Sequence, residues 1–161
     1  MNNWKRSGRL GLVFGLSLGM TMSLVPMRAA DDSRSQTGKL EGTWFTQVTI
    51  RDCQNGAVLR TFSALNTFNS GGTMTDTTTG ASPSLRSPGL GKWEKAGSKT
   101  YNAISLAFLF NSAGIWTGTQ KLAHTIEVVG NNSTFTSTNQ IFDPSGTLVS
   151  TGCATAVGQQ M

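Results

Sequence analysis

Side chains suited to catalysis are few in this chain of 161 residues. His124 is the only histidine, Tyr101 is the only tyrosine, and the motifs HExxH, CxxC and GxSxG are absent. The eight carboxylates follow residue 30 and form no cluster: Asp31, Asp32, Glu41, Asp52, Asp76, Glu94, Glu127 and Asp143. One histidine without paired carboxylates supplies too few ligands for a typical metal site. We therefore expect neither a metal nor any other cofactor.

His124 is the one candidate for acid–base catalysis. An imidazole that points into a cavity can transfer a proton or form a hydrogen bond with a ligand. The alternative is a structural histidine whose ring is held by a partner in the protein. The sequence leaves both interpretations open, so an enzymatic role depends on this residue alone.

Aromatic, aliphatic and amide side chains are better candidates for function, because a cavity lined by such groups binds small molecules. Their alternation within the expected strands places them, together with Thr46, on inward faces. For Trp44 the alternative role is to fill one end of the core. The residues expected to bind a ligand are Trp44, Val48, Phe62, Asn66, Phe108, Trp116, Gln120, Leu122, His124, Ile126 and Asn139.

Turn signals divide the chain beyond residue 40 into strand-length segments. Asn55-Gly56 is a strong hairpin signal, and Ile104, Leu106 and Phe108 show the period of two that is typical of a strand. The expected strands cover residues 43–53, 57–68, 73–79, 91–95, 100–110, 115–129, 133–143 and 147–157. This pattern predicts an all-β protein, an antiparallel up-and-down barrel of eight strands.

Cys53 and Cys153 are the only cysteines, separated by 153 − 53 = 100 positions. If the first and last strands pair antiparallel to close the barrel, both cysteines approach the same rim. We therefore predict a disulfide; two free buried thiols are the alternative. The longest loop, 80–90, lies at that rim, which makes the rim a candidate mouth. The alternative is that this loop is only a linker to a short strand.

The first 30 residues have the features of a secretory signal peptide. Lys5, Arg6 and Arg9 precede an apolar run over 10–25, and Ala29-Ala30 offers small residues for cleavage. An uncleaved membrane anchor is the alternative, although a run of 16 residues is short beside the roughly 20 needed to span a bilayer. We expect export to the periplasm or the medium without a stable membrane anchor, a disordered lead-in over 31–39, and one barrel domain over 40–161.

Charge argues against a nucleic-acid partner. Four of the 13 basic residues lie in the first 30 positions, so the remainder has 13 − 4 = 9 basic against 8 acidic residues. These basic residues are scattered singly, whereas nucleic-acid binding requires a basic stripe or patch.

Short motifs carry a resemblance to known barrels. Gly42-Thr43-Trp44 resembles the start of a calycin, a lipocalin or an avidin, although no arginine follows Arg86 to match the late arginine of lipocalins. A closer likeness is to small, uncharacterised, exported bacterial barrels of the lipocalin-like type. It rests on Ser87-Pro88-Gly89, Gly91-Lys92-Trp93, Tyr101 and Phe142-Asp143-Pro144-Ser145-Gly146. That resemblance implies a fold and supplies no activity.

Three functions are consistent with these patterns. The leading interpretation is an exported barrel that binds a small, apolar molecule. The first alternative is a cyclase or isomerase that resembles allene-oxide-cyclase-like barrels. The second is a barrel with a filled core that binds or inhibits another protein through its surface. The sequence does not predict the oligomeric state.

Overall fold

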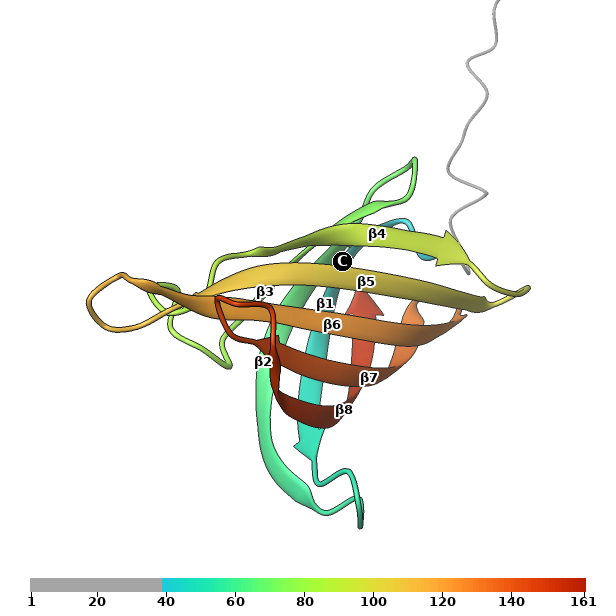
Figure 1. Cartoon of the computed structure of the whole chain (residues 1–161). Coiled ribbons are helices and arrows are strands. Elements are labelled where there is room, and N and C mark those ends of the chain that lie inside the picture. The colour runs from blue at the N-terminus through green and yellow to red at the C-terminus, as the bar shows by residue number, and fades with distance from the viewer. Residues whose placement is uncertain (1–38) are drawn as a thin grey trace, which may run out of the picture. The chain divides into compact units, whose positions relative to one another are not determined.

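The computed structural model describes residues 39–161, and all regular structure in that range is β-strand (Figure 1). The strands are β1 (Gly42–Arg51), β2 (Val58–Phe68), β3 (Thr73–Thr78), β4 (Gly89–Lys95), β5 (Thr100–Phe110), β6 (Trp116–Val129), β7 (Asn132–Phe142) and β8 (Leu148–Gln160). The expected signal peptide and nearly all of the lead-in lie outside the described residues. Residues 39–161 contain no helix long and apolar enough to cross a membrane.

The eight strands form a closed antiparallel barrel in which each strand pairs with the next in sequence. Pairing of β1 with β8 closes it, so Val48 lies between Phe62 of β2 and Ala156 of β8. The predicted fold class is therefore confirmed. The main differences in extent are that β4 begins at Gly89 and that β8 runs to Gln160.

One end of the barrel is packed solid with large side chains. Trp44 is fully buried there, and its indole Nε1 donates to the Leu40 carbonyl oxygen at 2.8 Å. Trp93 packs edge-on against Phe68 and Tyr101, with ring centroids 6.2 and 5.7 Å away. The buried cluster consists of Leu40, Trp44, Phe68, Met74, Tyr101, Ala103, Ile126, Val128, Phe135 and Ala156. The rest of the interior is packed less completely.

Strand β5 reverses the usual sorting of large and small side chains. Ala103, Ser105 and Ala107 are buried, whereas Leu106 and Phe108 are 50% and 57% exposed. The period-two pattern of β5 was identified correctly, but its large apolar face points outward. Small side chains therefore face the interior on this strand.

The Cys53–Cys153 disulfide is confirmed, with a Cα–Cα distance of 5.2 Å. Cys53 follows β1, and Cys153 pairs with Arg51 across the β1–β8 seam. The bridge therefore joins the first and last strands at the rim opposite the packed end. The loop between β3 and β4 lies at this same rim because consecutive strands alternate in direction.

Candidate functional site

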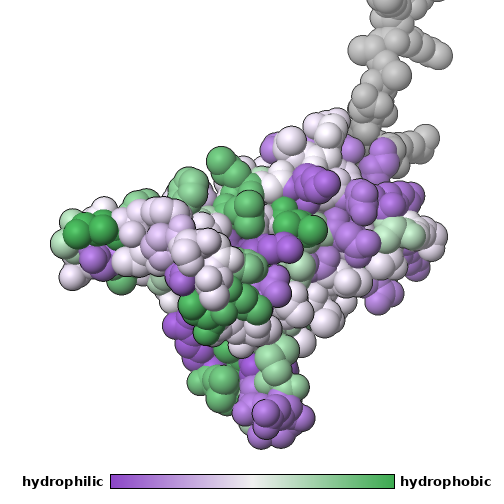
Figure 2. Space-filling model, in the orientation of Figure 1, coloured by the Kyte–Doolittle hydropathy of each residue, from purple (hydrophilic) through white to green (hydrophobic). Residues whose placement is uncertain are grey.

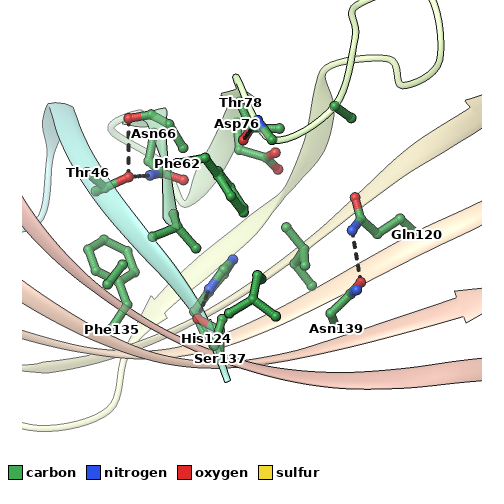
Figure 3. Close-up of a pocket in the computed structure, with 18 of the residues that line it drawn as sticks. Thr46, Phe62, Asn66, Asp76, Thr78, Gln120, His124, Phe135, Ser137 and Asn139 are labelled. Carbon is green, nitrogen blue, oxygen red and sulfur yellow. Dashed lines mark hydrogen bonds between the residues drawn. The ribbon is translucent and has the colours of Figure 1, made fainter. Parts of the chain in front are cut away.

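The barrel interior contains a cavity of about 120 Å³ on the disulfide side of the packed core (Figure 3). Strands from both halves of the barrel contribute to its wall, and the β3–β4 loop contributes Gly80 and Ala81. The surface that faces the cavity is mainly apolar, although ten polar or charged side chains also line it. The aliphatic and aromatic side chains of the wall are those of Val48, Ile50, Phe62, Ala64, Ala81, Leu122, Phe135, Ala154 and Ala156. The fold thus provides an interior space that is largely apolar.

Seven of the eleven residues expected to bind a ligand line this cavity: Val48, Phe62, Asn66, Gln120, Leu122, His124 and Asn139. Trp44 and Ile126 are fully buried in the packed end instead. Phe108 and Trp116 do not reach the interior, since 57% and 43% of their surfaces are exposed. Both residues were expected to point inward. Phe108 points outward because the small side chains of β5 face the interior. Trp116 lies at a register shift of the β5–β6 ladder, where it pairs with Phe110.

An ion pair that sequence reasoning missed lies on the cavity wall. The Arg86 guanidinium contacts the Asp76 carboxylate at 2.6 Å, and the two residues are 7% and 4% exposed. Ser105 donates to the other carboxylate oxygen at 2.6 Å. Buried charges persist only when paired and hydrogen-bonded in this way. No local signal pointed to the pair, because a lone arginine in a polar loop is usually solvated.

The β3–β4 loop places Arg86 by pairing with β5. The Phe110 amide donates to the Leu85 carbonyl at 2.9 Å, and the Ser87 amide donates to the Phe108 carbonyl at 3.0 Å. These two backbone hydrogen bonds hold the loop against β5 and direct the Arg86 side chain into the barrel. The loop is therefore part of the site and more than a linker.

A chain of hydrogen bonds leads from Arg86 across the cavity wall. Arg86 Nε donates to Gln120 Oε1, and Gln120 Nε2 donates to Asn139 Oδ1 at 2.9 Å (Figure 3). Because a guanidinium only donates, it fixes the orientation of both amides. Asn139 Nδ2 has no hydrogen-bond partner within residues 39–161.

A second polar pair lies on β1 and β2. Asn66 Nδ2 donates to Thr46 Oγ1 at 3.0 Å, and Thr46 donates to the Ala64 carbonyl at 3.2 Å (Figure 3). The Thr46 hydroxyl thus both donates and accepts inside the protein. We assign this pair to holding β1 against β2.

His124 is held by one neighbour and leaves one nitrogen unpaired. Its Nδ1 lies 2.7 Å from Ser137 Oγ, and its ring packs edge-on against Phe135 with centroids 5.9 Å apart. Its Nε2 is buried, with no hydrogen-bond partner in the described part of the chain. Burial lowers the pKa of His124 from 6.5 to about 4, and the Asp76 carboxylate opposes this only in part. The imidazole is therefore neutral at pH 7.

The mouth is formed by β2 and the β3–β4 loop. The Arg60 guanidinium lies 5.1 Å from the centroid of the Phe62 ring and donates to the Gly80 carbonyl at 3.1 Å. A Cβ added at Gly80 would lie 2.8 Å from the Phe62 ring, so a larger residue at this position would have to displace the ring. Phe62 is thus confined between the arginine and the loop.

Comparison of the chain with protein-family models, curated proteins and solved structures gives no match. The functional argument therefore depends on the geometry of the barrel. Within residues 39–161, no group of three or more His, Cys, Asp and Glu side chains is arranged to hold a metal ion.

Proposed function

We propose that this protein binds a small, largely apolar molecule inside its barrel. The observation that carries the proposal is the cavity of about 120 Å³, with mainly apolar walls, beside a solidly packed end. Small residues face this space where larger ones would have filled it: Ala64, Ala154 and Ala156. Filling an interior gap normally stabilises a protein, so a gap that is left open is consistent with a space kept for a ligand.

The size of the cavity limits the ligand. Apolar cavities of about 150 Å³ take up a benzene ring. The space here is of that order, so the ligand is about one ring in size. A long lipid would have to leave most of its surface outside the barrel.

The setting supports an exported binding protein. Disulfides are typical of oxidising compartments outside the cytosol, in agreement with the expected signal peptide. The eight-stranded meander also has the strand number and order that the resemblance to lipocalin-like bacterial barrels implies. Barrels of this size hold a single small ligand or none.

Native mass spectrometry of the protein purified from its own periplasm or medium tests the proposal. We expect a species heavier than the bare chain that loses the excess mass on denaturation. Ala154→Phe, which fills the cavity, should abolish that species, whereas Ala123→Phe on the outer side of β6 should retain it. Absence of a retained molecule, together with no uptake of ring-sized probes, would refute the proposal.

A cyclase or isomerase is the second candidate, because the neutral His124 lies on the cavity wall. Such an enzyme would convert the retained molecule into an isomer of equal mass. Chromatography of the released molecule before and after incubation with fresh protein separates the two functions. His124→Gln should stop conversion in an enzyme and leave the apolar contacts of a binder in place.

The outer surface carries the feature expected of a protein-binding barrel. Leu90, Leu106 and Phe108 are exposed on β4 and β5, and Figure 2 shows apolar residues gathered among polar ones on the viewed face. A protein-binding barrel was also expected to have a filled core, however, and this interior contains a cavity. Surface binding is therefore the third candidate.

A further inference from the structure

We infer that the molecule bound in the cavity is an uncharged, ring-sized compound with a carbonyl oxygen, which accepts a hydrogen bond from Asn139 Nδ2, with His124 Nε2 as a second donor. This inference rests on the proposed function and adds the chemical class of the ligand.

The first donor follows from the direction of the hydrogen-bond chain. Arg86 can only donate, so Gln120 turns its oxygen toward Arg86 and its nitrogen toward Asn139. Asn139 accepts that bond with its oxygen, and its nitrogen has no partner within residues 39–161. Because Asn139 lines the cavity, this N–H is offered to whatever occupies the space.

The second donor follows from the pairing of His124 with Ser137. If Ser137 donates to Nδ1, the neutral ring carries its hydrogen on Nε2, and only that N–H is unsatisfied. If Nδ1 donates instead, both the Ser137 hydroxyl hydrogen and the Nε2 lone pair lack partners within residues 39–161. Unpaired buried polar groups are costly, so the first arrangement is favoured. Nε2 is thus a second hydrogen-bond donor.

The two donors lie on the same wall of the barrel. His124 pairs with Ser137 across the β6–β7 ladder, and Asn139 is the next inward-facing residue of β7. Nε2 is closed to solvent in the present packing, so a ligand contacts it only after a small shift of the wall. Asn139 is therefore the primary donor.

The charges around the cavity favour a neutral acceptor over an anion. Arg86 is neutralised by Asp76 at 2.6 Å, and the carboxylate is further held by Ser105. A buried anion needs an unpaired positive charge, and the inner wall offers none among the described residues apart from Arg60 at the mouth. A ketone, ester or amide oxygen satisfies donors without bringing a charge.

Three probes of similar shape test this inference by calorimetry on the full mature chain: acetophenone, cumene and benzoate. We expect acetophenone to bind at least about tenfold more tightly than cumene, since one or two net hydrogen bonds to a buried site give that ratio. We expect benzoate to bind more weakly than acetophenone at pH 7. Equal or tighter binding of cumene would overturn the inference while leaving the proposed function intact. Tighter binding of benzoate would overturn the neutral class, and failure of all three probes to bind would count against both proposals.

Variants assign the donor. Asn139→Leu should remove most of the preference for acetophenone over cumene, whereas Asn102→Leu, the same change on the exposed side of β5, should retain it. His124→Phe should reduce the preference less. If Asn139→Leu keeps the preference and His124→Phe abolishes it, the assignment of the primary donor is wrong. The probe series on the unmodified protein decides the ligand class even if a variant fails to fold.

Discussion

The Arg86 guanidinium lies 2.6 Å from the Asp76 carboxylate inside the barrel, where a loop residue meets a strand residue across the cavity wall. Asp76 belongs to β3, and Arg86 precedes β4 by three positions. Their contact therefore attaches the loop at the mouth to the body of the barrel, and it pairs two opposite charges that are almost fully buried.

Removing one member of this pair should destabilise the protein strongly. Arg86→Met leaves the Asp76 carboxylate buried without a counter-charge, which costs about 3–5 kcal/mol in comparable sites. Asp76→Leu should have a similar effect, and the double variant should lose much less than the sum. Urea unfolding of the four proteins in a double-mutant cycle measures the coupling. Additive losses would show that the pair acts as two independent residues.

Gly89 should not tolerate a side chain, for a reason that involves the same carboxylate. A Cβ added at Gly89 would collide with Asp76 Oδ2, so Gly89→Ala must displace the carboxylate from Arg86. We expect a loss of about 3 kcal/mol in the free energy of unfolding, comparable with breaking the pair. Gly97→Ala is the matched control, because a Cβ there would lie 3.6 Å from Thr100 and should change stability by less than about 0.5 kcal/mol. Equal effects of the two changes would contradict this account.

His124 should make the protein less stable in mild acid. Its pKa is about 4 in the folded protein and near 6.5 when unfolded, so between these values the unfolded chain binds the extra proton. The free energy of unfolding should therefore decrease as the pH falls from about 6.5 to about 4, by up to about 3 kcal/mol, and this contribution should then level off. Urea unfolding at half-unit pH steps measures it. His124→Gln should flatten that part of the profile, and an unchanged slope would assign it to other groups.

The disulfide should contribute more to stability than any single hydrogen bond. It closes a loop of 100 residues, for which chain entropy predicts up to about 4.7 kcal/mol. Cys53→Ala with Cys153→Ala should lower the free energy of unfolding by about 2–4 kcal/mol. Adding a reductant to the unmodified protein should reproduce that loss and leave the double variant unaffected. A reductant effect on the double variant would show that the loss has another cause.

The fold could be predicted from sequence because its signals are local. Turns such as Asn55-Gly56 and the period-two alternation of the strands depend on neighbouring residues. The cysteine pairing then followed from the direction of the strands. These features do not depend on which face of a strand is inside.

The candidate site was predicted only in part, because it depends on that choice of face. On β6 and β7 the inward positions of Gln120, His124 and Asn139 were chosen correctly. On β5 the apolar alternation led to Phe108, because large side chains are usually the buried ones, and here the small ones are. The contact between Asp76 and Arg86 depends on the path of a whole loop, for which the sequence carries no periodic signal.

The β1–β8 seam has a consequence for how the chain folds. Seven of the eight strand pairs join neighbours in sequence, whereas closure brings together residues such as Arg51 and Cys153, which are 153 − 51 = 102 positions apart. Hairpins form in microseconds, but contacts of high sequence separation carry a loop-closure cost and slow folding. Until that last ladder forms, the meander is an open sheet with β1 and β8 as unprotected edges. Formation of this ladder removes both edges, and the Cys53–Cys153 disulfide beside it covalently links the two strands.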